Sequence, residues 1–377
     1  MKFVLVGTAY PHRGGIAHYV ALLTRELRAA GHEVTVISFS RQYPGFLFPG
    51  KSQEETGPET IRVDAEPLID TVNPLSWFRA AARIRSLAPD LVVYKYWMPF
   101  FAPAYGTVAR RVRAAGIRNC FLLDNLIPHE RRPGDLALTR WALGPVDCFI
   151  AQSAAVAGDL RSFRPRAPLA EVPHPVYSIF PPGAGRAAAR ERLGVTASEV
   201  ALFFGFIRGY KGLANLFRAV ARIPGERDFQ LLVGGEFYED DRPYRRLMAE
   251  LGIEHRVVLH DRYIPNDEVG DFFNAANVVV LPYVTATQSG IIQIAFNYDR
   301  PVITTDVGGL PEVVRPGELG EVVPAEDPGR LAEALLDYFD GGKEARYAPR
   351  VAEEKKRYSW SGLVEVLEGF ARGEDGA

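Results

Sequence analysis

Residues 277–309 read NVVVLPYVTATQSGIIQIAFNYDRPVITTDVGG, and this stretch decides the fold. Two short runs rich in β-branched residues, 277–282 and 300–305, lie on either side of the helical pattern IIQIAFNY. Short apolar runs separated by a helix are typical of parallel strands buried on both faces of a sheet. The stretch therefore predicts one strand–helix–strand unit of an α/β protein.

The same alternation continues along the whole chain. In the first half we expect strands at 2–7, 33–39, 90–95, 120–124 and 147–152. In the second half we expect them at 200–205, 229–234, 256–260, 277–282 and 300–305. Proline and glycine accumulate over 173–185, which favours a domain boundary there. The pattern predicts two doubly wound, Rossmann-like domains, 1–176 and 177–356, each binding ligand at the carboxyl ends of its strands.

The bulk composition excludes several classes of function. The 377 residues are 47% hydrophobic and carry a formal net charge of -2, so the chain lacks the positive field typical of nucleic-acid-binding proteins. Cys120 and Cys148 lie in apolar runs, which indicates buried thiols in a reducing compartment and argues against a zinc cluster. The N-terminal residues show no signal-peptide pattern, and no apolar run approaches the ~20 residues of a membrane span. We predict a cytoplasmic protein with no metal and no nucleic-acid partner, and peripheral contact with the inner face of the membrane stays open as an alternative.

Two segments combine glycine or positive charge with the start of a helix. Gly14 and Gly15 separate the first strand from the first helix, where backbone amides can approach a phosphate or a sugar. Arg208 and Lys211 directly follow the strand that opens the second domain, and two cations there can clamp a diphosphate. The alternatives are a tight turn for the glycine pair and a solvated basic turn for the cations.

The quoted stretch predicts the opposite wall of the same site. Residues 285–290 are small or hydroxyl-bearing, and Thr287 or Ser289 can cap the following helix, leaving its free amides for an anion. On this segment alone an ordinary helix cap is the favoured interpretation. Gly308 and Gly309 then permit close backbone approach, and the carboxylate of Glu312 can accept sugar hydroxyls.

Together these motifs resemble the retaining, nucleotide-sugar-dependent glycosyltransferases of GT-B fold, family four. Gly14-Gly15 corresponds to the family's N-terminal glycine pair, and IRGYKG, 207–212, to its diphosphate-binding Arg and Lys. RPVITTDVGGLPEVV, 300–314, resembles the family's PVIATDVGGLPE. YSWSGLVEVLEGFA, 358–371, resembles its last helix, so we expect 357–377 to pack back onto the first domain across a cleft.

The resemblance implies a donor site made of the matching residues and their neighbours. These are Gly14, Gly15, Arg208, Lys211, Thr287, Gln288, Ser289, Gly290, Gln293, Gly309 and Glu312. The chain departs from the family where two glutamates usually stand eight positions apart, because those positions fall on Thr287 and Ile294. Ribose recognition is then expected from Gln293 or from the backbone.

A second departure lies after the fourth predicted strand. The family often has a histidine there, whereas this chain has Asp124, followed by Asn125, His129 and Glu130. Asp124 ends an apolar strand at the ligand edge, so we interpret it as catalytic together with Arg208 and Lys211. Asn125, His129, Glu130 and Trp97 are candidates for the acceptor side.

The main hypothesis is transfer of a hexose from a nucleoside diphosphate sugar to a sugar, glycan or lipid-linked acceptor. The resemblance implies retention without a metal, with the leaving diphosphate taking the acceptor's proton. Alternatives are a nucleotide-sugar epimerase using Asp124, His129 and Glu130, or a non-catalytic binding protein. The aromatic run at 94–106 is followed by Arg110, Arg111 and Arg113, so the aromatics are either core or a lipid-contacting surface beside anionic headgroups.

Overall fold

The computed structural model describes residues 1–45, 52–55, 63–128 and 132–374. Its first sheet has seven parallel strands in the order β3-β2-β1-β4-β5-β6-β7. The strands are β1 Lys2–Val6, β2 Glu33–Arg41, β3 Ala65–Asp70, β4 Leu91–Tyr96, β5 Arg118–Leu123, β6 Cys148–Ala151 and β7 Leu169–Glu171. The helices of this part are α1 Gly15–Ala29, α2 Pro74–Leu87, η2 Pro99–Phe101, α3 Ala102–Arg113, α4 Asp135–Leu143 and α5 Ala154–Phe163.

The second sheet has six parallel strands in the order β10-β9-β8-β11-β12-β13. The strands are β8 Glu199–Phe204, β9 Phe229–Gly234, β10 Val257–His260, β11 Val278–Leu281, β12 Val302–Thr305 and β13 Gly320–Val323. Its helices are α6 Arg186–Leu193, η3 Gly209–Lys211, α7 Leu213–Val220, α8 Arg242–Leu251, η4 Glu254–Arg256, α9 Val269–Ala275, α10 Gly290–Asn297, α11 Leu310–Val313, α12 Pro328–Asp340 and α13 Lys343–Glu354. The predicted α/β class with two doubly wound sheets is confirmed.

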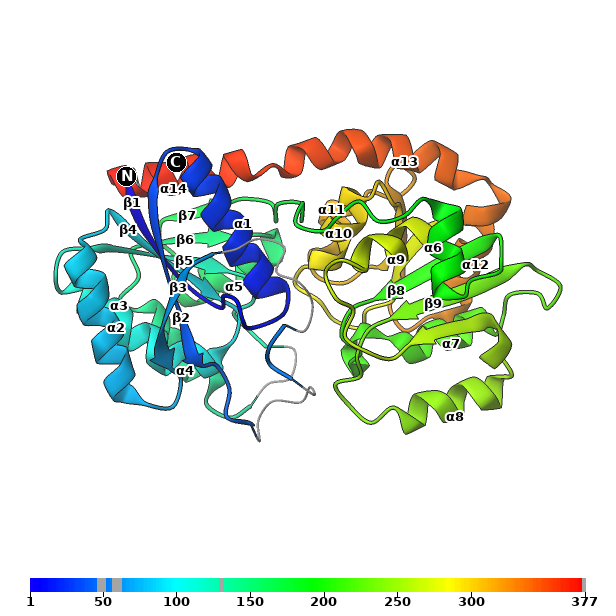
Figure 1. Ribbon diagram of the computed structural model, residues 1–377, viewed down its shortest axis with the longest axis horizontal. Coiled ribbons are helices and arrows are strands. Elements are labelled where there is room, and N and C mark those ends of the chain that lie inside the picture. Colours follow the sequence, from blue (N-terminus) through cyan, green and yellow to red (C-terminus); the bar gives the residue numbers. More distant parts are fainter. Residues whose placement is uncertain (46–51, 56–62, 129–131, 375–377) are drawn as a thin grey trace.

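The end of the chain returns to the first sheet. After α13 come η5 Lys355–Tyr358 and α14 Trp360–Arg372, and α14 contacts α1 and β4 (Figure 1). Trp360 donates a hydrogen bond to the Val176 carbonyl at 3.0 Å, and one buried apolar cluster includes residues of both sheets and α14. The two sheets are therefore joined by a shared core as well as by the connecting chain.

The strand orders indicate where a ligand would bind. Each sheet reverses its winding where two strands that are not consecutive lie side by side, β1 beside β4 and β8 beside β11. Ligands of doubly wound sheets bind at the carboxyl ends of the strands at such a switch point. The segments that follow these four strands carry Gly14, Trp97, Lys211 and Thr287, so both sheets bring predicted site residues to the same gap.

Several further expectations can be compared with the structure. Cys120 and Cys148 are buried free thiols on β5 and β6, as predicted. In the aromatic run, Phe101 is fully buried and belongs to the core of the first sheet, so the core interpretation holds for that residue. Among the described helices, none combines the length and apolar character needed to cross a bilayer.

Candidate active site

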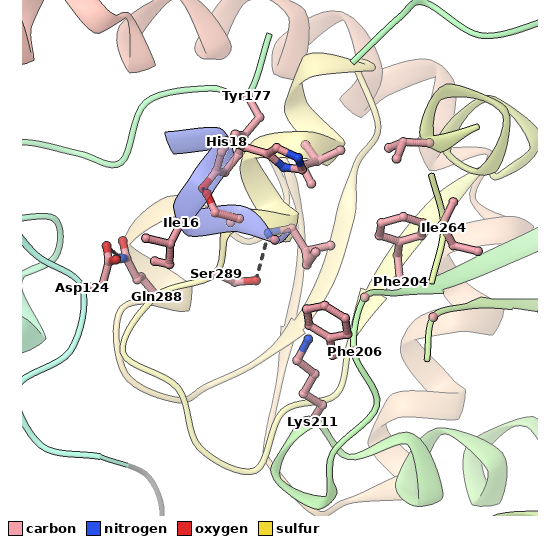
Figure 2. A pocket seen from close by; sticks show the side chains of 18 of the residues that line it. Ile16, His18, Asp124, Tyr177, Phe204, Phe206, Lys211, Ile264, Gln288 and Ser289 are labelled. Carbon is pink, nitrogen blue, oxygen red and sulfur yellow. Dashed lines mark hydrogen bonds between the residues drawn. The ribbon is translucent and has the colours of Figure 1, made fainter. Parts of the chain in front are cut away.

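A cavity of about 420 Å³ lies between the two sheets and takes its lining from both (Figure 2). The predicted residues that line it are Gly14, Gly15, Trp97, Asp124, Asn125, Lys211, Thr287, Gln288, Ser289 and Gly290. Ile294 also lines it. The residues singled out from distant parts of the sequence are thus brought around a single space.

Four other predicted residues do not line this cavity. Glu312 instead accepts a hydrogen bond from the Ala154 amide at 2.9 Å, at the start of α5. Gln293 is buried within α10. Gly309 packs against the backbone of the 287 segment, since a Cβ added to it would lie 2.6 Å from the Thr287 carbonyl oxygen. Arg208 lies with its guanidinium 5.6 Å from the Tyr238 ring centroid. His129 and Glu130 fall outside the described residues.

Two helices begin at the cavity wall. Gly14 precedes α1 with a φ of 107°, a conformation that favours glycine, and Gly14, Gly15 and Ile16 line the cavity. At α10 the N-cap is Ser289, whose hydroxyl accepts from the Ile291 amide at 3.3 Å, so of the two predicted caps the structure uses Ser289. The free amides at both helix starts make this part of the cavity attractive to an anion.

Lys211 adds positive charge to the same region. Burial, and then the neighbouring Arg208, lower the pKa of its ammonium to about 8. No carboxylate of the described residues lies within ion-pair distance of it. A Cβ added to Gly205, which has a φ of 101°, would lie 3.2 Å from the Lys211 Nζ, so glycine makes room for the ammonium. The cavity therefore contains a cation that no carboxylate in the described part of the chain neutralises.

Asp124 is held by Lys95, which is not among the predicted site residues. Lys95 Nζ donates to Asp124 Oδ1 at 2.5 Å and to Gln152 Oε1 at 3.0 Å. Gln288, from the second sheet, donates to the same Oδ1 at 2.8 Å, while Asp124 Oδ2 is buried without a hydrogen-bond partner. Burial raises the pKa of Asp124, against the opposing effect of Lys95, and lowers the pKa of Lys95 to about 8.

Arg13 and Glu236 form another contact between the two halves that was not predicted. Their side chains make an ion pair at 2.5 Å and are almost completely buried, although they are far apart in sequence. The Arg13 guanidinium also lies 4.6 Å from the centroid of Tyr263. Arg13 directly precedes the predicted glycine pair, but its partner could not be inferred without the fold. The structure therefore has its two halves in contact around the cavity.

One side of the cavity is apolar and aromatic. Phe204, Phe206, Tyr263 and Ile264 line it, and His18 packs edge-on against Phe180 with ring centroids 5.3 Å apart. Burial lowers the pKa of His18 to about 4. This histidine is therefore neutral at neutral pH, and the side of the cavity suits a flat, uncharged group.

The glycine pair at 308–309 allows close backbone packing against residues 286–287. Gly308 has a φ of 50°, and a Cβ there would lie 1.7 Å from the Ala286 carbonyl oxygen. We expect Gly308→Ala to lower the free energy of unfolding by about 3 kcal/mol or more, from steric overlap added to left-handed strain. Gly317→Ala is the control, since Gly317 has a φ of 74° but open space around it. Urea unfolding measures both, and equal losses would contradict the role of the overlap.

Comparison with known proteins identifies the family. A model described as Glycosyltransferase Family 4 matches residues 13–178, and one described as Glycosyl transferases group 1 matches 198–340. The chain is 30% identical over 380 residues to a D-inositol 3-phosphate glycosyltransferase of Streptomyces scabiei, covering 92% of this chain and 83% of the relative. A relative of the same name from Streptomyces bingchenggensis is 32% identical, with 95% and 86% covered. The chain belongs to glycosyltransferase family 4.

Solved structures agree on the fold of this glycosyltransferase. Sucrose-phosphate synthase from Thermosynechococcus elongatus superposes with a TM-score of 0.73 at 21% identity, covering 99% of this chain and 98% of the other. Anabaena Alr3699/HepE, solved in complex with UDP, has a TM-score of 0.74 at 16% identity, with 99% and 100% covered. The fold is therefore GT-B, two Rossmann-like parts facing each other. The family models and the curated relatives show that the protein is an enzyme of the glycosyltransferase class.

Proposed function

We propose that this glycosyltransferase moves a hexose from a nucleoside diphosphate sugar to a sugar, glycan or lipid-linked acceptor, with retention and without a metal ion. The observation that carries the proposal is Lys211, a half-buried lysine with no carboxylate partner among the described residues, facing a cavity where α1 and α10 begin. A diphosphate supplies the negative charge that this arrangement lacks. Arg208 is near enough to Lys211 to lower its pKa and would share that charge.

The rest of the cavity has the chemistry of the remaining donor groups. The side formed by Phe204, Phe206 and Tyr263 would take the flat base. The unpartnered Oδ2 of Asp124 would accept a hydrogen bond from a hydroxyl of the transferred sugar. Because the HepE structures contain UDP and UDP-glucose, uridine diphosphate is the first nucleotide to test.

In the proposed reaction the bond between the anomeric carbon and the diphosphate oxygen breaks as the acceptor oxygen approaches from the same face. The new bond from that oxygen to the anomeric carbon retains the configuration. The acceptor's proton passes to the departing diphosphate, so no separate carboxylate base is needed. Lys211 and the amides at the starts of α1 and α10 would stabilise the charge that develops on the diphosphate.

The proposal is tested by a binding screen followed by product analysis. Uridine, guanosine and adenosine diphosphates and their hexoses are added to the protein, and the unfolding temperature is recorded. We expect one base to stabilise the protein, by about 2.7 kcal/mol when its concentration is 100 times Kd. NMR of the products from the matching sugar donor then distinguishes a retained glycoside or free sugar from an epimerised donor. Failure of all three nucleotides to bind would refute the proposal.

A further inference from the structure

The first sheet carries a concentration of exposed apolar side chains. Eight large hydrophobic residues are exposed in the part of the chain that the structure describes. Six of them lie on α2, on α4 or in the turn before α2, namely Val72, Leu75, Phe78, Leu136, Leu138 and Trp141. With α3, which contacts both, these two helices form one layer over the sheet (Figure 1). We call the outer side of this layer the α2–α4 face.

The orientation of α4 is unusual for a helix on a water-exposed surface. Thr139, Ala142 and Leu143 are its buried residues, whereas Leu136, Leu138 and Trp141 are exposed by 42%, 37% and 40%. A surface helix normally turns its large apolar side chains toward the core. The sequence of α4 thus provides apolar side chains for something outside the fold.

The charge of these helices differs from that of the chain. The three helices carry seven arginines and one acidic residue, Asp135, whereas the whole chain has a net charge of -2. Two of the arginines pair with carboxylates, Arg83 with Glu66 and Arg113 with Asp147. The other five make no ion pair with a described carboxylate; they are Arg79, Arg85, Arg110, Arg111 and Arg140. The face therefore has an excess of positive charge around its apolar residues.

Two arginines are stacked on the exposed aromatics. The Arg110 guanidinium lies 3.9 Å from the Trp141 ring centroid, and that of Arg111 lies 4.8 Å from Phe78. Each pair places a flat apolar ring and a positive charge in contact with each other. A surface of tryptophan, phenylalanine and leucine with arginines beside them matches the boundary between anionic headgroups and acyl chains.

We propose that the α2–α4 face docks on the surface of an anionic phospholipid bilayer. The apolar side chains would enter the headgroup region, and the unpaired arginines would contact lipid phosphates. A second copy of the chain fits this face less well, because the five arginines without a described ion-pair partner would then face the same five of the other copy. A nucleic acid would use the charge but leave the six apolar side chains in water.

The test is co-sedimentation of the purified enzyme with vesicles. One set is phosphatidylcholine mixed with phosphatidylglycerol, and the other is phosphatidylcholine alone. We expect binding to the anionic vesicles that weakens with salt, and binding at least about tenfold weaker to the neutral ones. Binding to neither set, or equally to both, would overturn the proposal.

Two triple variants separate the apolar and charged contributions. In one, Leu75, Leu136 and Leu138 become Ser; in the other, Arg79, Arg111 and Arg140 become Gln. All six side chains are exposed, so circular dichroism and the unfolding temperature should not change. Each triple should weaken vesicle binding about tenfold or more, whereas Tyr10→Ser and Arg330→Gln, both away from the face, should not.

Wild-type binding by both triples would overturn the proposal. Analytical ultracentrifugation and a titration with duplex DNA complete the experiment. If the wild-type enzyme does not bind vesicles but self-associates, and the triple variants do not, the face binds a second copy of the chain. If it binds DNA instead, and the triple variants do not, the face binds nucleic acid.

Discussion

Lys211→Met should lower kcat/KM for the nucleotide-sugar donor by about 10²- to 10³-fold, the loss typical of removing one preorganised group that stabilises a developing oxyanion. Methionine keeps the length and packing of the side chain and removes the charge. The ammonium has no carboxylate partner in the described part of the chain, so its removal breaks no ion pair. The loss should therefore appear in donor kinetics rather than in folding.

Stability should change in the opposite direction from activity. Because burial and Arg208 lower the pKa of Lys211 from 10.5 to about 8, the charged form disfavours the folded state. That cost is fully present below about pH 8 and disappears as the pH rises past 10.5. Without donor, Lys211→Met should therefore unfold at a higher temperature than the wild type at pH 7, and the difference should vanish at alkaline pH.

The control is Lys356→Met, since Lys356 is an exposed lysine on η5 that pairs with Glu353. It should leave both kcat/KM and the unfolding temperature close to those of the wild type. Calorimetric scans and initial rates measured over the same pH range provide both readouts. A Lys211→Met enzyme that is less stable but fully active would contradict the diphosphate role.

The fold could be predicted from sequence because its central strands are buried on both faces. All ten predicted strands are present, as continuous apolar runs should be. The three that were missed, β3, β7 and β13, are edge strands. β3 has the sequence AEPLID, whose proline and charged residues are tolerated at an edge, and β7 has three residues. In β3 and β7 most side chains are half-exposed and the continuous apolar pattern is absent, whereas the edge strand β10 keeps an apolar run, VVLH, and was predicted.

The site was predictable to the extent that its residues follow strand ends. Lys211, Asp124 and the 287–290 segment do so, and all line the cavity. Lys95 and Arg13 were missed because their partners depend on the tertiary arrangement. A signal existed for Lys95, since a lysine inside the apolar strand LVVYKY needs a buried partner. For Arg13 the partner Glu236 lies in the other half of the chain, and no local pattern connects them.

Asp124→Asn should lower kcat/KM for the donor by about 10²-fold, because an amide takes the place of a charged acceptor in the cavity. The amide still offers an oxygen to Lys95 and Gln288, so the fold should survive.

Lys95→Met should instead destabilise the enzyme by about 3–5 kcal/mol, since it leaves a carboxylate buried without its ion-pair partner.

The pH profile distinguishes a positioning role of Lys95 from a merely structural one. Burial raises the pKa of Asp124, and Lys95 opposes that effect. Without Lys95 the pKa of Asp124 should rise further. On acidification the Asp124 carboxylate should therefore become protonated at a higher pH than in the wild type. The acid limb of kcat/KM should therefore move to higher pH in Lys95→Met, whereas a purely structural lysine would lower the rate at all pH values.

The double variant Lys95→Met with Asp124→Asn separates stability from catalysis. Once the carboxylate is neutral, no unpaired charge is buried, so the double variant should be more stable than Lys95→Met alone. Its kcat/KM should remain as low as that of Asp124→Asn, because the charged acceptor is still missing. Recovery of activity together with stability would show that Asp124 supports the fold and does not contact the sugar. If the double variant recovers stability but not activity, the reaction requires the carboxylate of Asp124 itself, whose Oδ2 has no hydrogen-bond partner in the structure.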